Sequence, residues 1–340
     1  MKRWVAAWAL ALGIRIIHAQ EPGAAFLTLP HSVRSEGAGG SAGLALGAEA
    51  LGLNPALISP TSSQGQLYTS FAQLWEDTTY AHLAGAWRVG KQHTGLGIAL
   101  STVKTDANSD RDAQGTLTGT TSDSQDTTAM VGMSLRPSVP WRVGGTVRLF
   151  RSEIGNYQSD TAWSTDWGAA WSARKTLIAF SINHLGPGQQ FINQQDPLPT
   201  ALRADGSWTT THFTWVLGAS QEIAAARTRL SGGLEYRWGP LALRSGLNTH
   251  WGGEEESTND SSTEEWLSGL SAGVGVHAGK SLRFDYAVRQ PSSHFDVIHQ
   301  ASLSWWWGPA PQPFNRAKPK GKKTVPKGST PPPPRPRLKL

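Results

Sequence analysis

Charged side chains recur at every second position in several otherwise apolar stretches. Glu235 and Arg237 alternate with Leu234 and Tyr236, and the same spacing recurs around Asp285. In an extended chain this spacing places charges on one face and apolar groups on the other. The chemistry this allows is ion pairing between neighbouring strands, in an interior screened from lipid, where charges are costly. The set expected to form such a network is Arg148, Glu235, Arg237, Arg244, Arg283, Asp285 and Arg289.

Other reactive groups do not form a recognisable catalytic or metal-binding pattern. The ten histidines include no His-Glu-x-x-His motif, and the chain has no cysteine, no Gly-x-Ser-x-Gly elbow and no phosphate loop. Asp106 to Asp112 alternates oxygen donors as a calcium loop does, but Arg111 occupies the position that requires glycine. A solvated loop is therefore favoured there over a calcium site. The sequence predicts no enzyme, no catalytic residue, no metal and no cofactor.

The alternation of period two predicts strands as the elements that position these charges. About fourteen such segments are expected, and an even number returns the chain to the side where it began. They centre on residues 66–75, 78–89, 95–103, 126–136, 141–152, 161–172, 176–185, 200–208, 213–222, 227–238, 241–250, 266–278, 281–289 and 297–307.

The connections between these segments alternate in length. The long ones are 104–124, 153–160, 186–199, 252–265 and 290–296, and all are odd-numbered in chain order. Short turns on one side and long loops on the other are typical of outer-membrane barrels. The pattern predicts an all-β fold, a transmembrane antiparallel barrel over residues 64–307. Its outward residues would meet membrane lipid or lipopolysaccharide. Trp163, Trp167 and Trp171 are interpreted as lipid-facing or interfacial rings, with an aromatic lumen wall as the alternative.

The N-terminus carries the features of a secretory signal peptide. Lys2 and Arg3 precede a mostly apolar run, and Ala19 is a small residue at a plausible cleavage point. Residues 1–19 are therefore assigned to export, and no later run approaches the roughly 20 apolar residues of a membrane helix. A closed barrel is the remaining way to span a membrane. The expected location is the bacterial outer membrane, after signal-dependent export.

The net charge of +6 comes from the two ends of the chain. Residues 308–340 hold nine Lys/Arg and residues 1–19 hold three, with no acid in either, which leaves 19 basic against 25 acidic residues between them. The basic character is thus not a nucleic-acid surface. The tail at 308–340 also holds ten of the 21 prolines and is expected to be disordered and periplasmic. It is either a solvated extension or a tether to peptidoglycan or an acidic partner.

Residues 20–63 differ from the strands in being rich in glycine and alanine. The stretch ends in Asn54-Pro55-Ala56, a turn signal in which Pro55 has a fixed φ. A compact segment of small residues before a series of strands predicts a hatch that plugs the barrel. Its motif residues are Gly37, Gly39, Gly40, Asn54, Pro55 and Ala56.

The same stretch resembles the N-terminal signature of the PorV/PorQ family, relatives of the FadL-type transporters. The matching residues are Phe26, Leu27, Leu29, Pro30, residues 33–40, residues 49–51 and residues 54–57, with departures at Glu36, Ala38, Leu57 and Ile58. Residues 198–203 and the closing stretch 299–307 are also similar to family segments. The resemblance covers roughly residues 24–307.

The resemblance implies a non-enzymatic role and leaves three hypotheses. A PorV/PorQ relative would be an accessory or docking component for type IX-like secretion, with secretion-machinery or cargo proteins as partners. A FadL relative would instead take up small hydrophobic molecules through the lumen, although the inward charges weigh against an apolar path. A structural barrel tethered to the cell wall by its basic tail is the third. The first is favoured on the hatch signature and the closing strand.

Overall fold

The computed structural model describes residues 22–29, 31–60, 63–75, 77–89, 94–111, 116–191, 194–251, 269–279, 281–291 and 297–308. The predicted signal peptide, the basic tail beyond residue 308 and the acidic stretch 252–265 lie outside these residues. The assignments of export and tethering therefore stay predictions.

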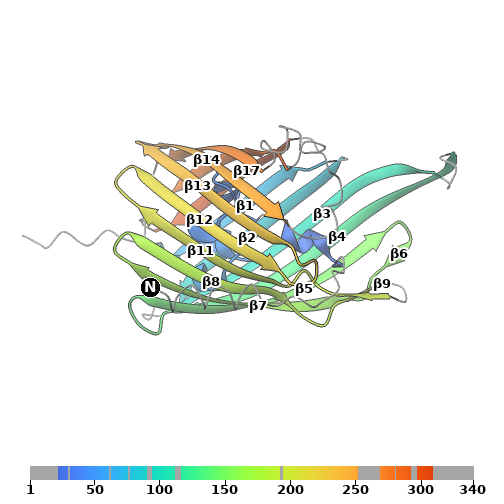
Figure 1. Cartoon of the computed structure of the whole chain (residues 1–340), viewed down its shortest axis with the longest axis horizontal. Coiled ribbons are helices and arrows are strands. Elements are labelled where there is room, and N and C mark those ends of the chain that lie inside the picture. The colour runs from blue at the N-terminus through green and yellow to red at the C-terminus, as the bar shows by residue number, and fades with distance from the viewer. Residues whose placement is uncertain are drawn as a thin grey trace, which may run out of the picture.

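Fourteen long strands close into an antiparallel barrel (Figure 1). β1 pairs with β17 from Gly65–Trp307 to Gln73–His299, and β4 pairs with β5, so no long edge remains open. The predicted fold class is confirmed, and each predicted segment overlaps one strand. The strands are β1 (Gly65–Gln73), β2 (Thr78–Val89), β3 (Thr94–Arg111), β4 (Leu117–Leu135), β5 (Trp141–Ile154), β7 (Ala162–Ala173), β8 (Thr176–Leu185), β11 (Ala201–Thr209), β12 (Phe213–Glu222), β13 (Thr228–Trp238), β14 (Leu241–Trp251), β15 (Leu270–Ala278), β16 (Leu282–Arg289) and β17 (Ile298–Trp307).

Three connections expected to be loops contain strands. β3 and β4 continue past their neighbours as a two-stranded ribbon, in which Arg111 pairs with Leu117 (Figure 1). The stretch from Asp106 to Arg111, considered above as a loop, is thus part of a strand. β6 (Tyr157–Gln158) pairs with β5, while β9 (Gln189–Phe191) and β10 (Gln194–Asp196) form a small hairpin. A two-stranded ribbon in water needs no apolar face, so these strands can be polar on both faces. Their composition is therefore similar to that of a loop.

The outer face of the barrel is apolar, as the alternation predicts. Trp163 and Trp167 point outward with about half of their surface exposed. Other large apolar residues are exposed on the remaining strands, among them Leu67, Phe71, Leu83, Leu100, Val131, Val147, Phe180, Trp215, Leu217, Phe284 and Trp305. A closed barrel with this outer band belongs in a bilayer. The predicted location in the bacterial outer membrane is confirmed.

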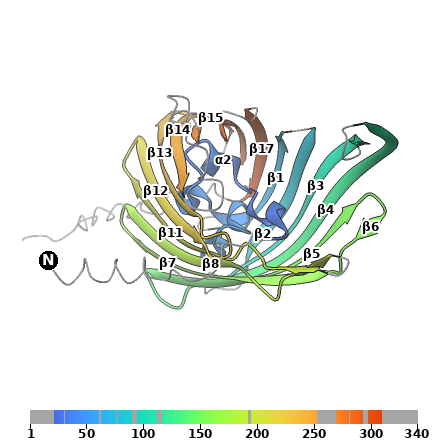
Figure 2. The ribbon, with the colours of Figure 1, turned by 45° about the vertical axis from the view of Figure 1, so that its right-hand side comes forward.

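Residues 22–60, called here the N-terminal segment, lie inside the ring of strands (Figure 2). The segment consists of single turns: η1 (Ala25–Thr28), α2 (Val33–Glu36), η2 (Ala42–Leu44), η3 (Gly47–Ala50) and η4 (Pro55–Leu57). Most of its side chains from His31 onward are buried. None of the helices in the described residues is long and apolar enough to cross a membrane.

Glycines on both sides let the N-terminal segment lie directly against the inner wall. A Cβ at Gly246 of β14 would lie 2.2 Å from the Gly39 nitrogen, and one at Gly144 of β5 would lie 2.4 Å from the Pro55 oxygen. Gly39 itself has φ +84°, a conformation that favours glycine. The close approach of backbone to backbone explains why the small residues are distributed over both the segment and the wall.

Candidate functional site

The lumen wall and the N-terminal segment are joined by a network of buried charges near the short-turn end of the barrel. Glu235 of β13 accepts hydrogen bonds from Arg34 (2.7 and 2.8 Å), Arg237 (2.7 Å) and Arg244 (2.7 Å). Arg34 belongs to α2, so this carboxylate links the segment to the wall. Glu235 is fully buried, and a charge at such depth is tolerated only when it is paired.

A second carboxylate of the segment, Glu49 in η3, extends the network. Arg283 of β16 contacts both Glu49 and Asp285, and Asp285 lies 2.8 Å from Arg244. Glu49 also accepts hydrogen bonds from Ser32 and Gln66, both at 3.1 Å. The result is an alternating chain of arginines and carboxylates that spans β13, β14 and β16 and contacts the segment at both ends.

The predicted set of seven charges is only partly brought together. Arg148 of β5 lies apart and forms a buried ion pair with Asp166 of β7 at 3.1 Å. Arg289 also lies apart, 3.5 Å from Glu36 of the segment. The other five are Glu235, Arg237, Arg244, Arg283 and Asp285, which lie in the network described above.

The predicted hatch motif lies at two contacts between the segment and the wall. The Asn54 side chain accepts a hydrogen bond from the Ala56 amide and donates one to the Phe180 carbonyl of β8, each at 3.0 Å. On the other side, the Gly39 amide donates to Ser271 of β15 at 3.0 Å. Gly37 lies against Gly273, and the Gly40 carbonyl accepts from Arg203 at 3.2 Å.

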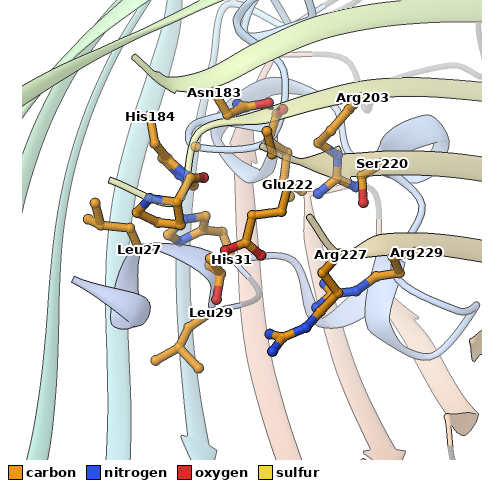
Figure 3. A pocket seen from close by; sticks show the side chains of 15 residues that line it. Leu27, Leu29, His31, Asn183, His184, Arg203, Ser220, Glu222, Arg227 and Arg229 are labelled. Atoms are coloured by element: carbon orange, nitrogen blue, oxygen red, sulfur yellow. Dashed lines mark hydrogen bonds between the residues drawn. The ribbon is translucent and has the colours of Figure 1, made fainter. Parts of the chain in front are cut away.

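A small pocket lies between the segment and the wall near the long-connection end (Figure 3). This mouth pocket has a cavity volume of about 50 Å³. Leu27, Leu29 and Leu53 of the segment give it an apolar side. The wall opposite carries polar and charged groups from β8, β11, β12 and β13, and from the turn before β13: Asn183, His184, Arg203, Ser220, Glu222, Arg227 and Arg229.

A bulge in β8 shapes one side of the mouth pocket. The β7–β8 ladder shifts register between Thr165 and Trp167, where β8 has one residue more than β7. His184, at this bulge, has φ +59°, and its amide donates to Asp166 at 2.8 Å. The imidazole Nδ1 lies 3.1 Å from the Pro199 carbonyl oxygen. The bulge thereby directs His184 into the pocket.

A second, smaller cavity of about 10 Å³ lies next to the mouth pocket, and is called here the inner cavity. Its wall comes from β2, β3, β4 and β5, and includes Tyr80, Ser101, Asp126 and Arg148. His31 of the segment lines both spaces. Its Nδ1 lies 2.6 Å from the Tyr80 hydroxyl oxygen, and its ring centroid lies 5.0 Å from that of His82.

Sequence reasoning missed the residues that the segment contributes to these contacts. Arg34 and Glu49 are the segment's partners in the charge network, and Asp205 of β11 accepts hydrogen bonds from Ser41 (3.0 Å) and the Ala42 amide (2.8 Å). His31 was counted only as one of the scattered histidines. The partners are far apart in sequence, so spacing alone carried no signal, although a lone acid in an alanine-rich stretch, such as Glu49, could have drawn attention.

Comparison with known proteins gives a likeness in fold. No family model matches the chain, and no curated protein sequence matches it. Among solved structures, a TodX mutant described as a monoaromatic hydrocarbon channel is similar at 12% identity and a TM-score of 0.61, over 82% of this chain and 98% of that one.

Two further solved structures show the same similarity in fold. The Pseudomonas putida toluene transporter TodX has 12% identity and a TM-score of 0.57, over 80% of this chain and 96% of that one. A Pseudomonas aeruginosa FadL homologue has 10% identity and a TM-score of 0.56, over 82% and 99%. The chain therefore has the FadL-type barrel fold. The narrower resemblance to PorV and PorQ receives no support from these matches.

Proposed function

We propose that the protein is a FadL-type channel that admits small hydrophobic molecules across the outer membrane, with the N-terminal segment as its hatch. The observation that carries this proposal is the mouth pocket. Leucines of the segment face a wall of polar groups at the end of the barrel with the long connections. The three leucines offer apolar surface to a hydrophobic molecule, and the polar groups opposite can fix its orientation. The transport role named for TodX supports the same assignment by fold analogy alone.

The closed geometry requires movement before anything passes. A cavity of about 150 Å³ is known to hold benzene, and the mouth pocket of about 50 Å³ is much smaller. The segment occupies the lumen below it, held by ion pairs and backbone contacts. Passage therefore depends on displacing part of the segment, and the structure corresponds to the resting form of such a channel.

The test is uptake of radiolabelled toluene by cells that lack their own outer-membrane channels for hydrophobic solutes. Cells producing the full-length protein are expected to take up toluene faster than cells with the empty vector. The blocking variant is Ala201→Trp, which places one bulky side chain in the mouth pocket and should return uptake towards the empty-vector rate. Equal rates in all three strains, with the barrel folded in the membrane, would contradict the channel.

A docking role of the PorV/PorQ type is the second candidate, favoured by the β3–β4 ribbon. The ribbon projects beyond the barrel rim on the side of the long connections (Figure 1), where it could meet an exported protein. Cross-linking in intact outer membranes followed by mass spectrometry tests it. Recovery of secretion-machinery or cargo proteins through the ribbon would favour docking, whereas their absence together with toluene uptake would favour the channel.

The tethered structural barrel, which depends on the tail, predicts that removing residues 308–340 releases the barrel from the cell-wall fraction.

A further inference from the structure

The mouth pocket and the inner cavity are neighbours separated by a thin partition. Two residues of the N-terminal segment, Leu27 and His31, line both spaces. Both side chains are almost fully buried, at 2% and 3% exposure. Neither cavity alone reaches the size that holds an aromatic ring. Moving these two side chains would join the spaces and add the volume the side chains now fill.

The partition lies where the segment is held by few strong interactions. His31 has one hydrogen-bond partner, the Tyr80 hydroxyl, and its buried Nε2 has none among the described residues. Leu27 packs in a small apolar cluster with Phe150, Ala162 and Leu198. The later part of the segment, by contrast, is fixed through Arg34, Glu49 and Asn54.

We propose that Leu27 and His31 form the gate of the lumen, and that protonation of His31 opens it to molecules the size of one aromatic ring. This inference rests on the proposed channel function. It assigns the moving part to the first turns of the segment, while the remainder of the segment stays in place.

The surroundings of His31 make an added proton unfavourable in the closed form. Tyr80 and His82 of β2, Arg148 of β5, His184 of β8 and Arg203 of β11 face it, while the carboxylate of Asp166 is occupied by Arg148 and the His184 amide. Asp126 of β4 lines the inner cavity with His31, and Glu222, Arg227 and Arg229 line the mouth pocket with it. Burial holds the pKa of the His31 imidazole well below its usual range, and the positive groups around it lower the pKa further.

The sign of the pH effect follows from these surroundings. A His31 released into the widened, hydrated mouth would recover a pKa of about 6.5. The open form then binds the proton more tightly than the closed form, so acidification favours opening. A single proton can shift the equilibrium by up to about tenfold per pH unit below that value.

The experiment is radiolabelled toluene uptake by the same cells at about pH 7.5 and about pH 5.5, on either side of the free histidine pKa. Wild type should take up toluene faster at the lower pH. Leu27→Ala and His31→Ala should be fast at both pH values, because the partition is removed. His31→Gln, which can still form a hydrogen bond with Tyr80 but cannot titrate, should stay slow at both. His299→Gln replaces a histidine that bonds Tyr286 on the outer surface and should behave as wild type.

The outcomes separate the gate from the channel. Uptake above the empty vector that is the same in wild type, Leu27→Ala and His31→Ala at both pH values would overturn the gate and leave the channel in place. Absence of uptake in every folded variant would overturn the channel and the gate with it. A pH response that survives in His31→Gln would assign the titrating group elsewhere and contradict the role of His31.

Discussion

Between β13, β14 and β16 the N-terminal segment meets the wall through paired charges, whereas near β2, β5 and β8 it meets the wall through histidines, a tyrosine and two small cavities. On the first side Glu235 has three arginine partners within 2.8 Å. On the second side the Nε2 atoms of His31 and His82 are buried without a partner among the described residues. Buried ion pairs must be broken to move the segment on the first side, whereas on the second side the His31 side chain gives up a single hydrogen bond. The comparison suggests a fixed side and a movable side.

The largest expected effect comes from removing the central carboxylate of the fixed side. Glu235→Ala removes the carboxylate that Arg34, Arg237 and Arg244 share. Breaking a buried ion pair costs about 3–5 kcal/mol, because the remaining charge stays buried without its partner. The loss is measured as the change in free energy of unfolding, from the folded fraction in urea titrations of the barrel in lipid vesicles. We also expect residues 22–60 to become sensitive to protease.

The matched control for Glu235→Ala is Glu153→Ala. Glu153 lies 3.7 Å from Arg151 with about half of its side chain exposed, and exposed pairs contribute only about 0–1 kcal/mol. If the two variants lost the same stability, the charge network would not be what holds the segment.

The next effect comes from the close backbone contact at β14. Gly246→Ala places a Cβ 2.2 Å from the Gly39 nitrogen, so the segment or the strand must shift. Overpacking of this kind costs about 1–3 kcal/mol, again read from urea titrations. Gly85→Ala is the control, because its Cβ would find only Trp87 and Ile98 side-chain atoms at 3.8 Å or more. Equal stability of both variants would mean that the segment adjusts freely.

The barrel wall was predictable from the sequence because its rule is local. Every second residue faces lipid, so the alternation at Leu230, Leu234 and Glu235 identified both the strand and its inward face. The ribbon was missed for the complementary reason. Residues 117–123 are mostly Thr, Ser and Gly, and nothing in their polarity distinguishes a paired strand in water from a loop.

The contacts within the lumen were much less predictable, because they join residues that are distant in sequence. Arg34 and Glu235 are 201 positions apart, and Glu49 and Arg283 are 234 apart. The sequence indicated that Glu235, Arg244 and Asp285 point inward, but not which partner each would meet. Arg148 and Arg289 were grouped with them as inward-facing charges, and only the closed barrel shows that they lie apart.

A smaller effect is expected at the Asn54 turn, through which the segment forms a hydrogen bond to β8. Asn54→Ala removes the acceptor for the Ala56 amide and the donor to the Phe180 carbonyl. Loss of such a cap with its second hydrogen bond costs about 1–2 kcal/mol. Limited proteolysis should then cut the segment near residues 54–60 sooner than in wild type, with the barrel still folded on electrophoresis. Asn54→Asp keeps the acceptor and should recover part of the protection.

The smallest effect concerns pH and the movable side. Burial lowers the pKa of His31, so below about pH 6.5 the unfolded chain takes up a proton that the closed form resists. The stability contributed at this site is therefore complete above about pH 6.5 and falls by up to about 1.4 kcal/mol per unit below it, until the lowered pKa is reached. His31→Gln should show a correspondingly flatter loss of stability between about pH 6.5 and 5.5 in urea titrations. Parallel curves for the two proteins would mean that His31 takes up a proton as easily in the folded barrel as in the unfolded chain, so that burial at this side of the lumen does not oppose its protonation.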